Sequence, residues 1–162
     1  MTKLFLEDLA VGQHFGSGCL RIDAEDIKRF ATEFDPQPFH LNEQAARETI
    51  FRGLAASGWH TAALTMRLLV ESEFDPAGGF VGASMDELRW PRPVRPGDEL
   101  RIKIEILEIR PSRSRPGQGI VKIRVATLNQ KDKAVQVYIA NIVVLGRRKE
   151  DSGGKAAADE KI

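Results

Sequence analysis

Two ionisable side chains, Asp35 and His40, lie five residues apart in a segment that also contains two prolines. An imidazole titrates near neutral pH and can transfer protons, and a carboxylate can orient water or act as a base. Because proline restricts the backbone, Pro36 and Pro38 are expected to hold the two side chains at a fixed separation. The segment therefore predicts acid–base chemistry. The alternative is that Asp35 caps a turn and His40 is an ordinary loop residue.

A second candidate feature is the pair Ser57 and Gly58. Serine is a favoured N-cap, and glycine lets another group approach the backbone closely. The first N–H groups of a helix lack intrahelical acceptors and form a partly positive end. A backbone N–H placed there can stabilise an oxygen that gains negative charge during a reaction. The alternative is an ordinary capped helix.

The helix that would begin at this cap is the element around which the chain is organised. Between Ala56 and Val70 the only charged residue is Arg67. A helix that is apolar nearly all round is expected to be buried. The segment is shorter than the ~20 apolar residues that a membrane span needs.

The catalytic candidates lie between this helix and an earlier one. Asp23 and Asp26 predict a helix start, and Asp35-Pro36 predicts its end near Phe34. A second short helix is expected from Asn42 to Phe51. Alternating apolar residues and turn signals predict strands at 14–22, 80–90, 100–109, 120–128 and 135–145.

These elements predict an α+β fold in which an antiparallel sheet wraps around one long helix. A single apolar helix leaves much of such a sheet uncovered, so a homodimer is expected. The domain is placed at residues 1–146. Residues 147–162 carry no apolar side chain except alanine before Ile162, and they are interpreted as a disordered tail.

Composition bears on nucleic-acid binding, localisation and metal binding. Lysine and arginine total 24 against 23 acidic residues, and a net charge of +1 argues against nucleic-acid binding through bulk charge. The single Cys19 and the lack of an apolar signal segment favour a soluble, cytoplasmic protein. Without a cysteine–histidine cluster, no metal site is expected. His60 is interpreted as a core residue and His14 as structural or exposed.

The chain resembles a known family in three stretches: Phe30-Ala31 with 34–40 (FDPQPFH), 51–58 (FRGLAASG) and 89–98 (RWPRPVRPGD). Together they resemble the MaoC-like acyl dehydratases, the (R)-specific enoyl-CoA hydratases of the hot-dog superfamily. The resemblance spans roughly residues 5–146. Two departures stand out, since the family usually has Asn at the position of Gln37 and His at the position of Ser57.

The resemblance implies a hot-dog dimer that adds water to a trans-2-enoyl thioester of coenzyme A or acyl carrier protein, with no other cofactor. Asp35 and His40 would activate the water and supply the proton, and the Gly58 N–H would polarise the thioester carbonyl. Substrate-binding candidates are Ser57, Arg89, Arg92 and Arg95. The three arginines could meet the phosphates of coenzyme A, or they could form a solvated cationic face.

Two other functions remain open at this point. A hot-dog thioesterase would direct water at the thioester carbonyl itself. A non-catalytic subunit would bind acyl thioesters but not convert them, which is expected if Gln37 and Ser57 make the site inactive.

Overall fold

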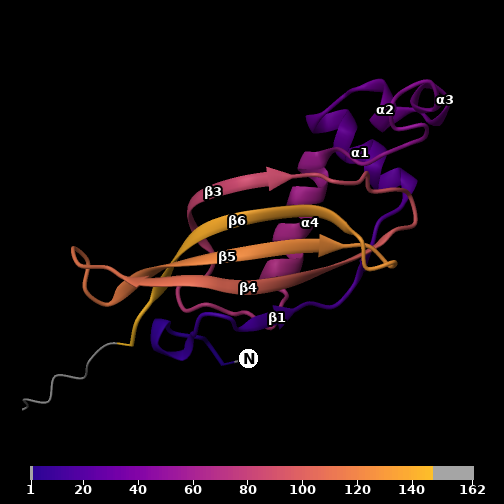
Figure 1. Ribbon diagram of the computed structural model, residues 1–162. Helices are drawn as coiled ribbons and strands as arrows, with labels where there is room; N and C mark the ends of the chain where they lie inside the picture. Colours follow the sequence, from indigo (N-terminus) through magenta and orange to yellow (C-terminus); the bar gives the residue numbers. More distant parts are fainter. Residues whose placement is uncertain (1, 148–162) are drawn as a thin grey trace, which may run out of the picture.

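The computed structural model describes residues 2–147, which form six strands and a few helices around one core (Figure 1). The strands are β1 (His14–Gly16), β2 (Leu20–Arg21), β3 (Val81–Arg89), β4 (Glu99–Pro111), β5 (Gln118–Leu128) and β6 (Ala134–Leu145). The helices are the 3-10 helix η1 (Leu6–Asp8) and α1 (Ala24–Phe34), α2 (Pro38–Leu41), α3 (Glu43–Arg47) and α4 (Gly58–Val70).

The sheet is antiparallel and runs in the order β1-β4-β5-β6-β3, with β2 paired to the first two residues of β4. Alternate residues of the long strands point to the same face, so Ile102, Ile104 and Ile106 bury their side chains on the side of α4. In Figure 1 the sheet curves across α4. The α+β prediction, an antiparallel sheet around a long helix, is confirmed.

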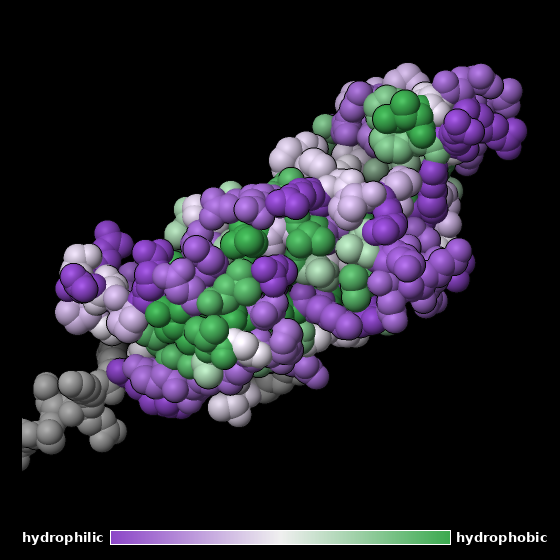
Figure 2. All heavy atoms as spheres, in the orientation of Figure 1, coloured by the Kyte–Doolittle hydropathy of each residue, from purple (hydrophilic) through white to green (hydrophobic). Residues whose placement is uncertain are grey.

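On the sheet face turned away from α4, charged side chains lie on β4 and β5, and half-buried valine and isoleucine side chains lie mainly on β6. In the space-filling view, hydrophobic atoms gather over the middle of the molecule and hydrophilic atoms surround them (Figure 2).

Helix α4 is buried on one side only, which corrects the expectation of burial nearly all round. Thr65, Leu68 and Leu69 are almost inaccessible, whereas Trp59, Met66 and Val70 are 62%, 42% and 63% exposed. The spacing of these exposed residues places them along one face of the helix. An apolar but exposed face therefore remains on the central helix.

The 23–57 segment forms one end of the molecule, where α1, α2 and α3 gather (Figure 1). Asp23 caps α1 by accepting a hydrogen bond from the Asp26 N–H, as predicted. Asn42 caps α3, but this helix ends at Arg47 instead of reaching Phe51. The expected connector also contains a short helix, α2, because Pro38 is suited to the first helical position.

Two further expectations need adjustment. The single strand predicted at 14–22 is two short strands, β1 and β2, which pair with separate parts of β4. Gly16 ends the first of them, consistent with the weak strand propensity of glycine. The predicted tail lies outside the described residues except for Arg147, whose Nη2 donates to both carboxylate oxygens of Asp8.

Within residues 2–147 there is no helix of sufficient length and hydrophobicity to cross a membrane.

Candidate active site

The site is built on a contact between Asp35 and His40, the two residues singled out by their spacing. Asp35 follows the last turn of α1, and His40 lies in α2. His40 Nε2 lies 3.3 Å from Asp35 Oδ2. The imidazole is only 4% exposed, and it packs edge-on against the Phe39 ring. The two side chains therefore meet as predicted, on a short and rigid piece of chain.

The other ring nitrogen fixes how His40 is oriented. His40 Nδ1 lies 2.6 Å from the carbonyl oxygen of Ala55, which can only accept a hydrogen bond. Nδ1 must therefore carry a proton, and Nε2 faces the carboxylate. A ring protonated at both nitrogens satisfies both acceptors. His40 is thus arranged to hold and release a proton at Nε2.

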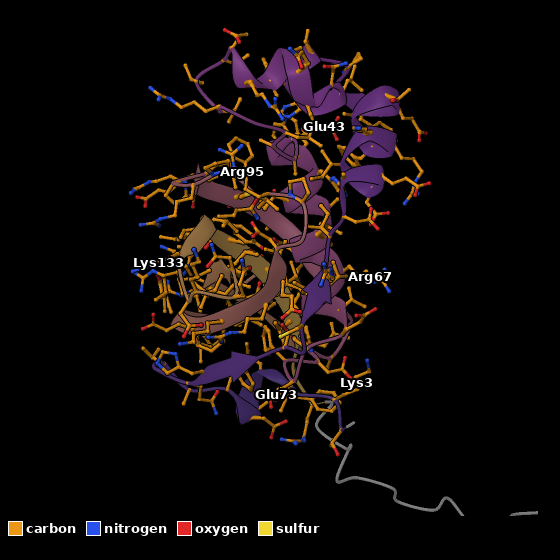
Figure 3. All side chains as sticks on the ribbon, turned by 90° about the vertical axis from the view of Figure 1, so that its right-hand side faces the viewer. Lys3, Glu43, Arg67, Glu73, Arg95 and Lys133 are labelled. Carbon is orange, nitrogen blue, oxygen red and sulfur yellow. The ribbon has the colours of Figure 1, made fainter. Side chains whose placement is uncertain are left out.

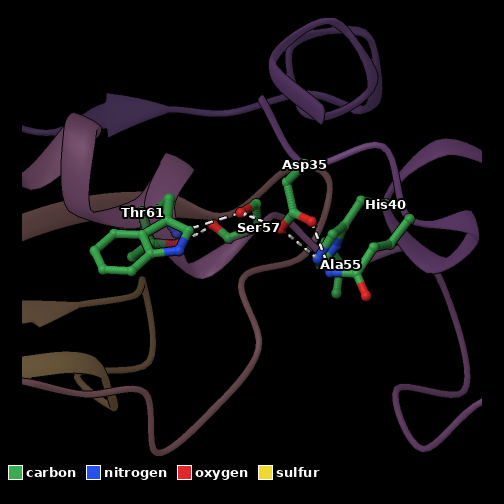
Figure 4. A network of polar contacts seen from close by, with 7 residues as sticks. Asp35, His40, Ala55, Ser57 and Thr61 are labelled. Carbon is green, nitrogen blue, oxygen red and sulfur yellow. Dashed lines mark hydrogen bonds and ion pairs between the residues drawn. The ribbon is translucent and has the colours of Figure 1, made fainter. Parts of the chain in front are cut away.

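Both oxygens of Asp35 are held by neighbouring side chains (Figure 4). Ser57 Oγ donates to Oδ2 at 2.6 Å, and Gln37 Nε2 donates to Oδ1 at 2.6 Å. Burial of Asp35 tends to raise the pKa of its carboxyl, but the hydrogen bonds from Ser57 and Gln37 and the proximity of His40 outweigh burial, so the pKa is lowered. Asp35 is therefore an anion at neutral pH.

Ser57 and Gln37 are the two positions at which the chain departs from the pattern of the family it resembles. The structure brings both to the same carboxylate. Ser57 is fully buried, and its hydroxyl also accepts a hydrogen bond from the Trp59 N–H at 3.3 Å. This placement favours a role in positioning Asp35 and capping α4 over direct contact with a substrate. The capping role was predicted from the sequence and is confirmed, whereas the hydrogen bond to Asp35 was not predicted.

Gly58 is the first residue of α4, so its N–H belongs to the turn whose N–H groups lack intrahelical acceptors. A side chain at this position would not fit, because a Cβ atom would lie 2.7 Å from the Trp90 ring. Gly58 lines a cavity of about 420 Å³ together with Asp35 and His40. The three predicted catalytic residues therefore share one cavity.

The rest of the cavity wall is mostly apolar. It comprises Gln37, Phe39, Phe51, Ala56, Trp59, Thr61 and the stretch from Trp90 to Val94. Most of these residues come from the connector between β3 and β4 and from the start of α4. The connector and the 23–57 segment thus form two sides of one pocket.

The three arginines proposed to bind phosphate lie in different settings. Arg92 lines the cavity, and its guanidinium donates to the Ala134 carbonyl at 3.0 Å. Arg89 is exposed and pairs with Glu87 outside the cavity. Arg95 lies beneath the helices of the 23–57 segment (Figure 3).

Arg95 binds the backbone of the segment that precedes α4. Its guanidinium donates to the carbonyls of Gly53 at 2.9 Å and Leu54 at 3.2 Å, and also to that of Phe51. Directly beside it, the Ala56 N–H donates to the Val94 carbonyl at 2.9 Å. These contacts favour a structural role for Arg95, which fastens the site segment to the sheet.

Of the other histidines, His60 is 7% exposed and stacks on Phe30 with ring centroids 4.4 Å apart. Burial is the main cause of the lowered pKa of His60. His60 is therefore a core residue, as interpreted, and His14 is exposed. Among residues 2–147, no group of three or more His, Cys, Asp or Glu side chains is arranged to hold a metal ion.

The fold and the site together define a hot-dog protein with an aspartate–histidine pair at the N-terminus of its central helix. The model of the family described as "MaoC like domain" matches residues 9–128. The chain belongs to this family, and the resemblance drawn from its motifs is confirmed.

Individual relatives agree with this assignment. A MaoC-like dehydratase structure from Rhodospirillum rubrum is 57% identical with a TM-score of 0.87, and the match covers 90% of this chain and 99% of that one. The 3-hydroxybutyryl-CoA dehydratase of Methylorubrum extorquens is 33% identical over 71% of each chain. The R-hydratase PhaJ1 of Pseudomonas aeruginosa is 25% identical with a TM-score of 0.71, and the match covers 97% of each chain. The chain is thus a member of a hydratase and dehydratase family.

Proposed function

We propose that this protein adds water to the double bond of a trans-2-enoyl thioester, or removes it in the reverse reaction. The observation that carries the proposal is the cavity in which Asp35, His40 and Gly58 lie together. Further support comes from similarity to relatives named 3-hydroxybutyryl-CoA dehydratase and R-hydratase. Coenzyme A or acyl carrier protein would carry the acyl group.

The roles follow from the protonation states that the geometry favours. Asp35, an anion, removes a proton from a water molecule as the water oxygen forms a bond to C3 of the substrate. The electron pair of the C2–C3 double bond moves toward the thioester carbonyl, whose oxygen accepts a hydrogen bond from the Gly58 N–H. The proton held at His40 Nε2 is delivered to C2, which completes addition of one water molecule.

The similarity to relatives named 3-hydroxybutyryl-CoA dehydratase and R-hydratase favours hydration over the thioesterase alternative. In a hydratase the carbonyl oxygen binds at Gly58, Asp35 directs water at C3 and His40 protonates C2. A thioesterase would instead direct the activated water at the carbonyl carbon. Release of free thiol from the acyl thioester distinguishes the two reactions.

The experiment is to incubate the protein with enoyl-CoAs and follow loss of the conjugated double bond. We expect His40→Ala and Asp35→Asn each to lower kcat/KM by 10²- to 10⁴-fold, the usual effect of losing a positioned acid or base. Both variants should stay folded, since neither residue contributes to the main apolar core. Variants that kept more than a tenth of the wild-type rate would show that the site assignment is wrong. If the wild type binds acyl-CoA but hydrates none, the non-catalytic function is correct.

We further propose that the protein is a homodimer. Strand β3 is at the edge of the sheet, and nearly all of its residues are exposed. Apolar Val81 and Met85 on this strand, and Met66 and Val70 on α4, are more than 40% exposed. A second copy pairing along β3 would cover this face and its unpaired backbone groups. Sedimentation at micromolar concentration should give twice the chain mass, and a folded monomer would refute the proposal.

A further inference from the structure

Trp90 lies directly against the proposed site of the thioester carbonyl. It follows the last residue of β3, and its six-membered ring covers Gly58, where a Cβ atom would come within 2.7 to 3.0 Å of three ring atoms. Trp59 packs against it edge-on with ring centroids 5.4 Å apart. Trp90 also lines the cavity. An acyl group bound with its carbonyl at Gly58 must therefore pass beside this indole.

The indole is tied to the interior of the protein. Its Nε1–H donates to Gln136 Oε1 at 2.8 Å. Gln136 is fully buried on β6, and its Nε2 donates to Thr65 Oγ1 on α4 at 3.1 Å. Thr65 Oγ1 in turn lies 2.6 Å from Thr127 Oγ1 on β5. The network thus joins Trp90 to three elements of the core.

A buried glutamine needs a reason, because an amide removed from water costs free energy unless its groups are hydrogen-bonded. Here one end of the amide accepts from Trp90 and the other donates to Thr65, so both ends are used. The ring position is consequently fixed by a satisfied buried network. A tryptophan without such an anchor could rotate away and admit a larger group.

We propose that Trp90, positioned by Gln136, limits the size of the acyl group, so that the pocket takes short-chain acyl thioesters and excludes longer ones. The proposal rests on the proposed function for its substrate class. Trp90 is the specificity-determining residue. Gln136 is a positioning residue that acts through it.

The test measures affinity for butanoyl-CoA and octanoyl-CoA by titration calorimetry. These saturated thioesters cannot be hydrated, so binding is measured independently of catalysis. The wild type should bind butanoyl-CoA more tightly. In Trp90→Ala the octanoyl-to-butanoyl affinity ratio should rise at least tenfold, since a single methylene in an apolar pocket already contributes about 10- to 200-fold.

Further variants separate positioning from general loss of structure. Gln136→Met keeps a similar unbranched shape but cannot bind the indole, and Trp90→Phe keeps an aromatic ring but lacks the N–H; both should shift the ratio in the same direction. The matched control is Thr127→Val, which removes one bond of the same network but leaves the Trp90–Gln136 bond intact. Its ratio should equal that of the wild type.

The outcomes distinguish the two proposals. Unchanged ratios in both Trp90 variants, or a wild type that binds octanoyl-CoA as tightly as butanoyl-CoA, would overturn the size limit whether or not hydration is observed. A ratio that depends on Trp90, in a protein that hydrates no enoyl-CoA, would support the size limit and overturn the proposed function.

Discussion

Replacement of Ser57 by alanine tests whether the hydrogen bonds around Asp35 matter for catalysis. The Ser57 hydroxyl donates to Asp35 Oδ2 at 2.6 Å, on the same oxygen that faces His40. A hydrogen bond to a charged group contributes about 1.5–3 kcal/mol. Loss of this contact leaves Asp35 free to shift from the position that proton transfer needs, so kcat/KM should fall about 10- to 100-fold, less than for loss of Asp35 or His40.

The same substitution has a predictable effect on the pH dependence. The hydrogen bond from Ser57 favours the ionised carboxylate, so its removal raises the pKa of Asp35. Because Asp35 must be ionised to accept a proton, the acidic limb of the kcat/KM profile should move to higher pH. The assay is the hydration rate measured from pH 4 upward, with the wild type beside it.

A companion variant separates chemistry from helix capping. Ser57 also caps α4, and Ser→Ala at an N-cap typically costs about 1 kcal/mol of stability, whereas Ser→Gly costs only a few tenths. Both Ser57→Ala and Ser57→Gly remove the hydrogen bond to Asp35. They should therefore share the rate loss and differ in melting temperature. A rate that falls only in the less stable variant would refute the reasoning, as would an acidic limb that stays in place.

Two other predictions concern stability. Burial lowers the pKa of His60 in the folded state, so the unfolded state binds more protons below about pH 6.5, and the free energy of unfolding should decrease as the pH falls below that value. Denaturant titrations at pH 5.5 and 7.5 should show a smaller difference in His60→Phe than in the wild type. Arg95→Lys keeps the charge but cannot form the same planar set of bonds to the three backbone carbonyls that Arg95 contacts. It should therefore lower the melting temperature. KM for the CoA ester should not rise selectively. A raised KM at unchanged stability would instead indicate contact with phosphate.

Local sequence signals predicted the elements well. Alternating apolar residues set the three long strands to within about two residues at each end, and the Asp23–Asp26 cap fixed the start of α1. These signals depend on residues only a few positions apart, so they can be recognised in the sequence without knowledge of the tertiary structure. The helix predicted to reach Phe51 was too long, since turns and bends follow Arg47. The first strand was wrong because its two halves pair with separate parts of β4, which is a tertiary contact that no local pattern shows.

The candidate site was predictable only in part. The proximity of Asp35 and His40 followed from their spacing on a stiff segment. The contact between Ser57 and Asp35 could not be predicted in this way, since it joins the start of one helix to the end of another across 22 residues. The Trp90–Gln136 bond spans 46 residues and depends on the register of β6, so no local pattern reveals it.

Within residues 2–147, few contacts other than those of Arg95 join the 23–57 segment to the sheet, so this segment is expected to unfold locally before the sheet does. The 23–57 segment carries both members of the acid–base pair, while the long strands β4, β5 and β6 form an extended ladder of their own. Cooperative units of a protein unfold locally at less cost than the whole molecule, particularly where few contacts hold them. Amide hydrogens of this segment should therefore exchange with solvent deuterium sooner than those of the ladder. The 23–57 segment would then be a separate cooperative unit, which can unfold and refold while the sheet remains folded.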